Sequence, residues 1–322
     1  MKNSIENAID LIKTNDNIFI VSHISPDGDN MGSSLALMWA LEKKNKNVTV
    51  LESDLIPDDF KFLPGSDSIK PYNENLGDID LLIALDCGDE ERLGLNKELL
   101  ERSNKVLNID HHVSNTNFGD VNVVDPDASA TGELVYELVK AMDISIDKNI
   151  AENLYTAIST DTGSFKYDST TSKTHRIVAE LLDTGIDKNK ININIYENMS
   201  FSKMNLLREA FKTLETFKGK RIATMEVTQD MLSETETSME DAEGIISFIR
   251  NLDTVEVAVL LKERKEKSIK VSLRTKKDVD ASKICKIFGG GGHKRAAGCT
   301  INEELNRAKE LIVKAIDKEM EL

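Results

Sequence analysis

The sequence is poor in the residues that mark several special classes of protein. It contains 3 cysteines, 5 prolines and 1 tryptophan in 322 residues, and aromatic residues make up 5% of the chain. Three cysteines far apart in the sequence do not suggest a disulfide framework, which favours a reducing compartment such as the cytoplasm. No apolar run reaches the ~20 residues of a membrane-spanning helix, and the N-terminus lacks the apolar stretch of a secretory signal. We therefore expect a cytoplasmic protein with no membrane partner.

The charge of the chain is unevenly distributed. The net charge of −15 by itself argues against a nucleic-acid partner. Residues 262–295, however, contain twelve basic and four acidic residues, a net charge of +8, which leaves −23 for the rest of the chain. This asymmetry indicates a local anion-binding surface, although a solvated face of a hairpin would give the same pattern.

The length fits two domains, since a domain typically has roughly 100–200 residues. In the first half, short apolar segments alternate with helical patterns, which is typical of a parallel sheet covered on both faces. The predicted strands are 17–21, 48–52, 80–85 and 105–109, and the predicted helices are 30–44, 129–142, 148–160 and 174–185.

The pattern changes in the second half. Residues 190–217 are helical and polar in pattern, and strands are predicted at 221–228, 255–263 and 268–275, with helices at 241–251 and 303–319. Overall we predict an α/β protein: a Rossmann-like, parallel-sheet domain at 1–190, a helical linker at 191–220, and a smaller α+β domain with a mixed sheet at 221–322.

Carboxylates and imidazoles follow three of the predicted strands. Each of these segments alone is weak evidence for a functional site, because an Asp-Gly-Asp segment is usually only a turn and an Asp after a helix can be a C-cap. In a parallel sheet, however, the carboxyl ends of the strands meet at the edge where ligands bind. The candidate ligands are His23, Asp27, Asp29, Asp86, His111 and Asp161. Four carboxylates and two imidazoles without cysteine suit Mn²⁺ or a related divalent cation.

The number of candidate ligands suggests more than one ion. Six ligands exceed what one catalytic ion needs if water must also bind, whereas two ions that share a carboxylate fit the count. Two ions ~3.5–4 Å apart activate water and stabilise both oxygens of a phosphoryl transfer. We therefore predict metal-assisted hydrolysis of a phosphate ester. We interpret Cys87 as a small buried thiol, and we exclude His175 as a ligand because it lies in the middle of a predicted helix.

A second motif lies at the end of the basic segment. Four consecutive glycines, 289–292, are followed by His293, Lys294 and Arg295. Glycines let backbone amides approach an anion closely, and His293 and Arg295 add side-chain donors. The alternative is a flexible linker. The spacing is not that of a P-loop.

Together these motifs resemble the DHH phosphoesterase superfamily, and the glycine motif resembles that of the DHH-associated C-terminal domain. The similarity spans nearly the whole chain. It is greatest to the compact bacterial branch, which contains nano-RNase/pAp phosphatases and stand-alone cyclic-di-AMP or pApA phosphodiesterases.

The resemblance implies a role for each candidate. It implies two Mn²⁺ ions, with Mg²⁺ or Co²⁺ as alternatives, in a cleft between the domains. One ion would be held by His23, Asp27 and Asp86, and the other by Asp29, Asp86, His111 and Asp161. His112 would face the scissile phosphate and Asp110 would orient the imidazoles. The far end of the substrate would be bound by Gly290, Gly291, Gly292, His293, Arg295 and Arg274, although Arg274 fits a solvent-facing position equally well.

The resemblance further implies hydrolysis of nano-RNA, pAp, pApA or cyclic-di-AMP to nucleoside 5′-monophosphates. One alternative is a RecJ-like single-strand exonuclease, which would need an extended basic groove with stacking aromatic residues and often an added OB-fold. The single tryptophan, Trp39, and the length of 322 residues disfavour it. Another is a non-catalytic nucleotide-sensing module. A homodimer is an expectation from the general frequency of dimers alone.

Overall fold

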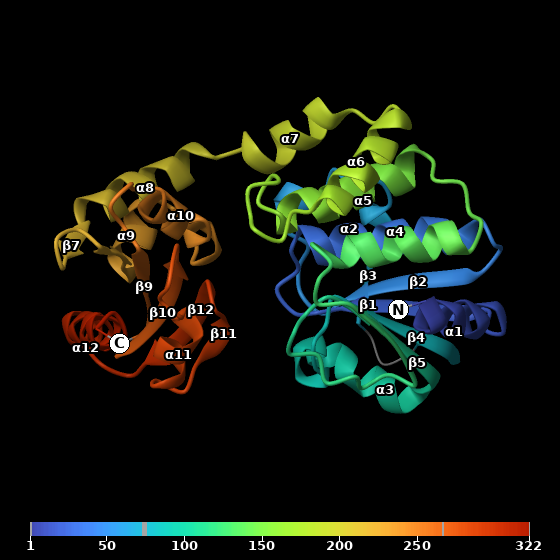
Figure 1. The fold of residues 1–322 in the computed structure, drawn as a ribbon, viewed down its shortest axis with the longest axis horizontal. Helices are drawn as coiled ribbons and strands as arrows, with labels where there is room; N and C mark the ends of the chain where they lie inside the picture. Colours follow the sequence, from blue (N-terminus) through green and yellow to red (C-terminus); the bar gives the residue numbers. More distant parts are fainter. Residues whose placement is uncertain (1, 73–75, 266, 322) are drawn as a thin grey trace. The chain divides into compact units, whose positions relative to one another are not determined.

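The computed structural model describes residues 2–72, 76–265 and 267–321. The chain forms two compact units, residues 1–198 and 199–322, and each contains its own six-stranded sheet (Figure 1). Among the described residues, no helix has the length and apolar character that crossing a bilayer requires.

The first unit is built on a parallel sheet with the strand order β3-β2-β1-β4-β5-β6. Its strands are β1 (Asn17–Ser22), β2 (Asn47–Glu52), β3 (Lys70–Pro71), β4 (Ile79–Leu85), β5 (Ser103–Asp110) and β6 (Val121–Val124). Its helices are α1 (Lys2–Lys13), α2 (Gly28–Glu42), α3 (Leu99–Arg102), α4 (Thr131–Ala141), α5 (Lys148–Asp161), α6 (Ser172–Asp183) and α7 (Lys188–Tyr196). Short 3₁₀ helices lie at Asp58–Phe60, Ser66–Ser68 and Glu90–Glu98.

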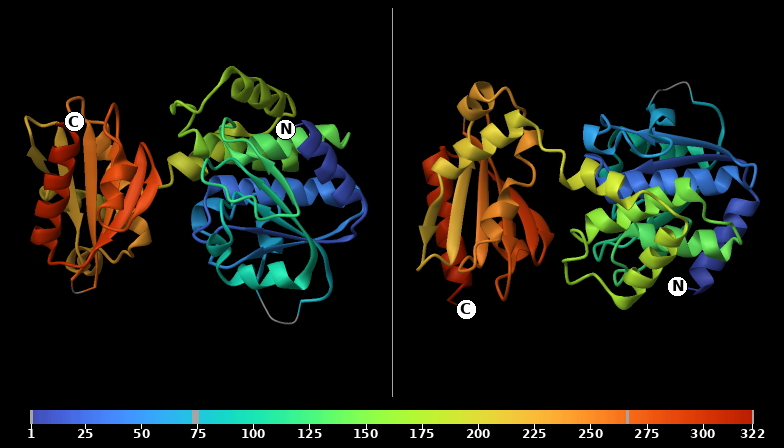
Figure 2. Two further views of the ribbon diagram at one scale, coloured as in Figure 1. Left: turned by 60° about the horizontal axis from the view of Figure 1, so that its bottom comes forward. Right: turned by 90° about the horizontal axis from the view of Figure 1, so that it is seen from above.

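The central strands are apolar on both faces because both faces are covered. Ile18 and Ile20 of β1 pack in the larger core with α1, α2, α4 and α5, whereas Phe19 and Val21 pack in a smaller core on the other face with Leu99 of α3. Figures 1 and 2 show α2, α4 and α5 on one side of the sheet and α3 on the other. The continuous apolar runs of these strands follow from this two-sided burial.

The second unit is built on a mixed sheet with the order β11-β12-β10-β9-β8-β7, in which only the β8–β9 pair is parallel. The strands are β7 (Glu215–Phe217), β8 (Ile222–Val227), β9 (Val257–Lys265), β10 (Ser268–Thr275), β11 (Gly291–His293) and β12 (Ala296–Ile301). The helices are α8 (Phe201–Lys212), α9 (Gln229–Glu234), α10 (Ile245–Arg250), α11 (Ala281–Lys286) and α12 (Leu305–Glu319), with a 3₁₀ turn at Glu240–Ala242. One face of the sheet packs on α11 and α12, and part of the other packs on α8, α9 and α10.

The structure confirms the predicted fold, an α/β protein with a parallel sheet followed by a mixed sheet, and differs in details. Residues 191–220, expected to be helical, include β7, which pairs with β8 across a turn whose residues Lys218, Gly219 and Lys220 all have positive φ. The helix expected at 241–251 begins at Ile245, because Gly244 has a φ of 87° that no α-helix allows.

Candidate metal centre

Three neighbouring strands end at the candidate site. The sheet order places β1, β4 and β5 side by side, and the chain leaves β1 and β4 toward opposite edges of the sheet. His23 follows β1, Asp86 follows β4, and Asp110 ends β5 ahead of His111 and His112. Such a switch point, at the carboxyl ends of the strands, is where open parallel sheets bind ligands.

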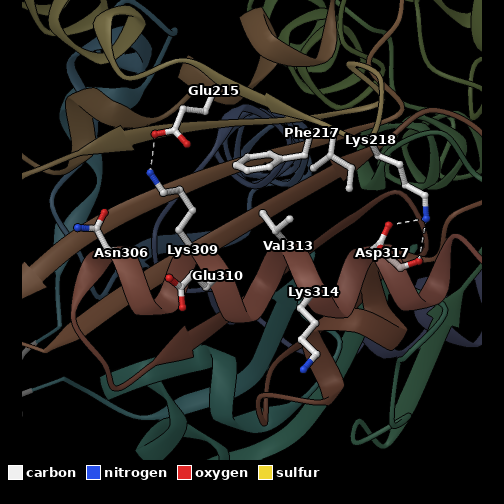
Figure 3. Close-up of a pocket in the computed structure, with 10 residues that line it drawn as sticks. Glu215, Phe217, Lys218, Asn306, Lys309, Glu310, Val313, Lys314 and Asp317 are labelled. Carbon is white, nitrogen blue, oxygen red and sulfur yellow. Dashed lines mark hydrogen bonds and ion pairs between the residues drawn. The ribbon is translucent and has the colours of Figure 1, made fainter.

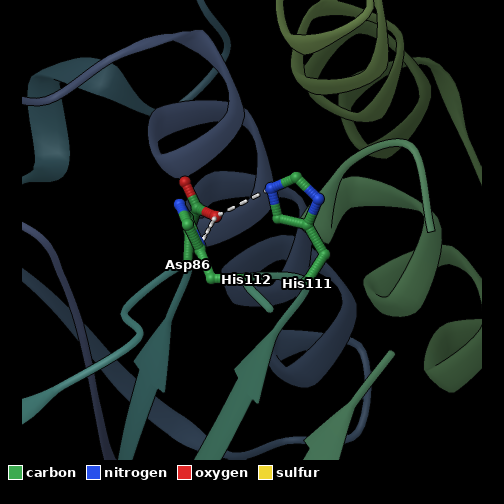
Figure 4. Close-up of side chains that lie close together, drawn as sticks. All are labelled: Asp86, His111 and His112. Atoms are coloured by element: carbon green, nitrogen blue, oxygen red, sulfur yellow. Dashed lines mark ion pairs between the residues drawn. The ribbon is translucent and has the colours of Figure 1, made fainter. Parts of the chain in front are cut away.

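Asp86 lies at the centre of the site. Its Oδ2 is 3.3 Å from His23 Nε2, and its Oδ1 is 3.6 Å from His111 Nε2. Figure 4 shows Asp86 at the end of its strand, facing the rings of His111 and His112. Asp86 has a φ of 54°, in the left-handed region that non-glycine residues rarely adopt. This turn ends β4 and points the two carboxylate oxygens at two different imidazoles.

The first group of ligand atoms comes from His23, Asp27 and Asp86, which lie within 4.8 Å of one another. Asp27 Oδ2 is 3.6 Å from His23 Nε2, while Asp27 Oδ1 caps α2 by accepting the N–H of Asp29 at 3.0 Å. His23 Nδ1 is 2.8 Å from the carbonyl oxygen of Ile24. With the proton on Nδ1, the Nε2 lone pair points at the carboxylates, as a metal-binding histidine requires.

The second group comes from Asp29, His111 and Asp161. His111 Nε2 is 3.8 Å from Asp29 Oδ2 and 3.5 Å from Asp161 Oδ2. His111 Nδ1 is 3.2 Å from the carbonyl oxygen of Ala128, so this ring too directs Nε2 at the acids. The structure thus brings all six predicted ligands together in these two groups, with Asp86 beside both. A third group of close ligand atoms joins Asp86 and His111 to His112.

The start of α4 holds two of these carboxylates. Asp29 accepts the N–H of Thr131 at 2.7 Å and that of Gly132 at 2.9 Å, and Asp86 accepts the Thr131 hydroxyl at 2.9 Å. Gly132 has no room for a side chain, because a Cβ there would lie 2.7 Å from that of Ala157. Sequence reasoning did not assign Thr131, whose only local signal is a Thr-Gly pair at the start of a predicted helix.

Asp110 and His112 form a hydrogen-bonded pair beside the two groups. Asp110 Oδ1 is 2.7 Å from His112 Nδ1, and Asp110 Oδ2 accepts a hydrogen bond of 2.6 Å from Asn115 Nδ2. The same nitrogen donates to Asn108 Oδ1 at 2.8 Å. The hydrogen bond to Asp110 raises the pKa of His112 above its usual value. Burial opposes this effect but is smaller. Asn115 was not recognised in the sequence, since asparagines in loops are common.

The electrostatics of the site favour a cation. Burial and the charge of Asp86 raise the pKa of Asp29 well above its usual value. Burial likewise raises the pKa of Asp161 to about 6, against the opposing effect of His111. Burial would lower the pKa of His23, but hydrogen bonds to Asp27 and Asp86 outweigh it and raise that pKa to about 11. In this cluster the buried acids resist ionisation and an imidazole retains its proton, because the carboxylates lack enough positive charge beside them. A bound cation would supply that charge.

The donor set fits divalent cations. Carboxylate oxygens and imidazole Nε2 atoms converge, and no thiol lies among the described ligand groups. Cys87 is buried, its Sγ is 3.1 Å from the carbonyl oxygen of Asp89, and burial raises its pKa to about 12, which agrees with an inert thiol. His175 lies in α6 with its ring centroid 5.6 Å from that of Phe165, away from these groups.

The glycine motif lies in the second unit. Gly290 packs against Gly298 and Cys299 so tightly that a Cβ would lie 2.2 Å from the Gly298 carbonyl oxygen. Gly291 and Gly292 pair with β12, and the backbone of His293 ends β11, but the His293 side chain lies outside the described part of the chain.

Two arginines lie near this hairpin. Arg274 is half-buried on β10 and pairs with Ala296 of β12, and the carbonyl oxygen of Arg295 accepts the N–H of Thr275. Arg295 Nη1 is buried and has no hydrogen-bond partner among the described residues. A buried cationic donor without a partner is costly, and an anionic ligand would satisfy it.

A surface pocket of the second unit contains none of the predicted site residues. It lies between β7 and α12, against Phe217 and Val313 (Figure 3). Lys309 in this pocket bonds Glu215 at 2.7 Å and Glu226 at 2.8 Å. Lys309 and Lys218 of this pocket are thus paired within the protein.

Comparisons with known proteins cover both units. Residues 17–158 match the DHH family, N-terminal domain, and residues 203–322 match the DHHA1 domain. The chain is 32% identical over 308 residues to the bifunctional oligoribonuclease and PAP phosphatase NrnA of Thermus thermophilus, covering 94% of this chain and 90% of that protein. It is 27% identical over 335 residues to the cyclic-di-AMP phosphodiesterase PdeA of Listeria monocytogenes, covering 96% of this chain and 48% of that protein.

A solved structure extends this likeness to the fold. The crystal structure of an exopolyphosphatase-related protein from Bacteroides fragilis has a TM-score of 0.92 and 30% sequence identity, and the match covers 99% of this chain and 96% of that one. Sequence and fold therefore agree over nearly the full length, and this chain belongs to the DHH family, with a DHH domain followed by a DHHA1 domain.

Proposed function

We propose that this DHH-family phosphoesterase hydrolyses short nucleotides at a pair of Mn²⁺ ions. His23, Asp27 and Asp86 would hold one ion, and Asp29, Asp86, His111 and Asp161 the other. The observation that carries this proposal is the position of Asp86, whose two oxygens lie 3.3 Å and 3.6 Å from the Nε2 atoms of two different imidazoles. The bound ions would supply Lewis acidity and a water molecule of lowered pKa.

The side chains around the ligands have supporting roles. Thr131 and the N–H groups at the start of α4 fix Asp29 and Asp86 in place, so neither carboxylate must reorganise when it binds a cation. Asp110 fixes the ring of His112 through Nδ1, and Asn115 in turn fixes Asp110. We assign His112 to the scissile phosphate, where its raised pKa keeps a proton available to phosphate oxygens or to the leaving group.

The second unit would bind the part of the substrate remote from the scissile bond. The unpartnered Nη1 of Arg295 and the tight backbone at Gly290 and Gly292 support an anion site there. His293 and Arg274 would complete this site. A small site of this kind selects short ligands. We therefore expect Arg295→Ala to weaken binding of dinucleotides far more than it slows hydrolysis of bis-p-nitrophenyl phosphate, and equal losses with both substrates would contradict this assignment.

The names of the relatives narrow the substrates to test. One is an oligoribonuclease and PAP phosphatase, and the other a cyclic-di-AMP phosphodiesterase. We propose short RNA and pAp as the substrates of this chain, because the first relative matches it over nearly the whole length of both proteins.

The decisive experiment is a substrate panel. The purified chain with Mn²⁺ is assayed on pAp, pApA, cyclic-di-AMP, a short RNA and a long single-stranded DNA, and kcat/KM is measured for each. We expect the highest values with the short linear nucleotides, and Asp86→Ala should abolish them. A preference for long DNA would instead favour a RecJ-like exonuclease, and binding without any turnover would favour a sensor.

A further inference from the structure

Glu133 is a charged side chain that the first unit buries beside the candidate metal centre. It lies in the first turn of α4 and is only 1% exposed. Its two oxygens have different neighbours: Oε1 accepts a hydrogen bond of 2.6 Å from the Ser129 hydroxyl, and Oε2 is 3.8 Å from Lys173 Nζ of α6. Burying a carboxylate costs free energy even when it is paired. The stability of the helix alone therefore gives no reason to bury this glutamate.

The first N–H groups of α4 are capped by another residue than Glu133. In a capping box, a glutamate at the third helical position would accept the N–H of the N-cap residue. In α4 the Asp29 carboxylate accepts the N–H groups of Thr131 and Gly132, and the N-cap residue Ala130 has no side chain that could accept one. Glu133 is bonded to Ser129 instead, one residue before the cap. It is therefore tied to the loop that precedes the helix.

This loop, between β6 and α4, carries the group that orients His111. The carbonyl oxygen of Ala128 is 3.2 Å from His111 Nδ1, although 17 positions separate the two residues in the sequence. His23 differs, because the carbonyl that meets its Nδ1 belongs to the next residue, Ile24. A carbonyl on a distant loop orients a ring only as well as the loop itself is held. The orientation of His111 therefore depends on what fixes Ala128.

Hydrogen bonds fix the loop at both of its ends. At its start the N–H of Asp125 donates to the carbonyl oxygen of Asp110 at 3.2 Å, and the N–H of Ala128 donates to that of Asp125 at 3.1 Å. At its end the Ser129 hydroxyl donates to Glu133. The Ala128 carbonyl belongs to the peptide group that joins Ala128 to Ser129. The hydrogen bond between Ser129 and Glu133 therefore restrains the direction of that carbonyl.

Lys173 supplies positive charge to the buried carboxylate. Its Nζ is 2.7 Å from Glu137 Oε1 and 3.8 Å from Glu133 Oε2. Burial would lower the pKa of Lys173, but the hydrogen bond to Glu137 and the charges of Glu137 and Glu133 outweigh it and raise that pKa. Glu137 shares this lysine one turn further along α4, away from the loop. The two glutamates thus differ in their relation to Ser129.

We propose that Glu133 is a positioning residue for His111. Through Ser129 it holds the Ala128 carbonyl against His111 Nδ1, so the ring keeps its proton on Nδ1 and presents Nε2 to the acids. This inference rests on the proposed function, in which His111 Nε2 binds one of the two cations. A group that orients a metal-binding histidine typically contributes about 10–100-fold to the affinity for the metal.

The experiment measures the state of the His111 ring and the binding of the cation separately. Long-range proton–nitrogen correlation spectra of the metal-free full chain give the tautomer of each neutral imidazole, and the chain has only 5 histidines to resolve. Isothermal titration gives the Mn²⁺ affinity, and thermal unfolding shows that each variant is folded. The wild type should show His111 with its proton on Nδ1.

Four variants separate the hydrogen bond from the charge. Ser129→Ala and Glu133→Ala should each give a mixture of His111 tautomers and weaken the binding of one Mn²⁺ about tenfold or more. Glu133→Gln keeps an acceptor for the Ser129 hydroxyl, so it should retain the single tautomer and nearly the wild-type affinity. Glu137→Gln is the matched control, since it removes a charge beside Lys173 without touching the loop, and it should change neither quantity.

Three results would overturn the role of Glu133. The first is a wild type whose neutral His111 carries its proton on Nε2. The second is a folded Ser129→Ala or Glu133→Ala variant that keeps both the wild-type tautomer and the wild-type Mn²⁺ affinity. The third is a Glu133→Gln variant that loses as much as Glu133→Ala, because a charge rather than the hydrogen bond to Ser129 would then be responsible.

The same measurements distinguish this role from the proposed function. A wild type that binds no Mn²⁺ contradicts the proposed function. The tautomer of His111 in the metal-free variants still decides whether Glu133 positions the ring. Ser129→Ala removes a single hydroxyl group, so it decides the question even if Glu133→Ala does not fold.

Discussion

Replacement of Asp86 by asparagine should separate metal binding from folding. Asparagine preserves the shape of the side chain and one oxygen, but it loses the charge and the second carboxylate oxygen. Asp86 Oδ1 also accepts the Thr131 hydroxyl at 2.9 Å, a contact that the amide oxygen can keep. The variant should therefore fold, and its loss should concern the cations.

The magnitude follows from the charge. A unit charge about 4 Å from another contributes about 4 kcal/mol at an effective dielectric constant of about 20, and 1.4 kcal/mol corresponds to a factor of ten. Because Mn²⁺ carries two charges, this energy is a lower bound, and Asp86→Asn should weaken Mn²⁺ binding by at least about 10³-fold. The value of kcat/KM should fall at least as much. The metal-free variant should unfold at a somewhat lower temperature than the wild type at pH 7. Burial would raise the pKa of Asp86, but the hydrogen bond from His23 and the charges of the histidines hold it below its usual value, so the ionised carboxylate stabilises the metal-free fold.

The assay is isothermal titration with Mn²⁺, combined with thermal unfolding in EDTA and steady-state kinetics on pAp. Asp58→Asn is the control, since that carboxylate lies in an exposed 3₁₀ turn and its side chain is 88% exposed. An Asp86→Asn variant that binds two equivalents of Mn²⁺ with unchanged affinity would refute the reasoning, whatever its activity.

Three further predictions concern residues around the centre. Asn115→Ala should lower kcat about tenfold with KM and Mn²⁺ affinity unchanged, because it frees the Asp110 carboxylate that orients His112; an unchanged kcat would exclude this positioning role. Mn²⁺ affinity should rise as the pH is increased from 5 to 7, in part because the carboxyl of Asp161, with a pKa of about 6, must lose its proton to bind a cation. Titrations at several pH values should show a smaller rise in Asp161→Asn, in which only the other ligands, such as His23, still exchange protons for the cation, and an equal rise in both proteins would contradict this. Burial raises the pKa of Glu52 to about 7 in the folded chain, so its ionisation costs stability as the pH rises from the unfolded value near 4.5, up to about 3 kcal/mol above pH 7. Glu52→Gln should therefore raise the unfolding temperature at pH 8 and not at pH 4, and equal shifts at both pH values would contradict this.

The sequence predicted seven of the strands and the convergence of the candidate ligands because both follow from local patterns, whereas β3, β6, β7, β11 and β12 were not predicted. Buried strands require apolar runs, and the ends of parallel strands meet at one edge, so His23, Asp86 and His111 could be placed together without coordinates. The strand order of the sheet, in which the chain changes direction between β1 and β4, could not be predicted from the sequence. It was not needed for this prediction, because the carboxyl ends of parallel strands lie at one edge in any order.

What the sequence did not predict depends on contacts between distant segments. Thr131 reaches Asp86 across 45 residues, and nothing near it in the sequence indicates that its hydroxyl would find a carboxylate. Lys262 was counted as part of a basic segment, yet it is buried beneath Glu243, 19 residues away. A charge run shows that cations are present, whereas the pairing of strands and the packing of distant segments decide which of them are buried.

The central claim is that Asp86 stands between two cations. The most direct measurement is anomalous diffraction from crystals of the full chain grown with Mn²⁺. The account predicts two manganese peaks per chain, both within coordinating distance of the Asp86 carboxylate, with His23 on one and His111 on the other. A single peak, or two peaks of which only one contacts Asp86, would contradict it.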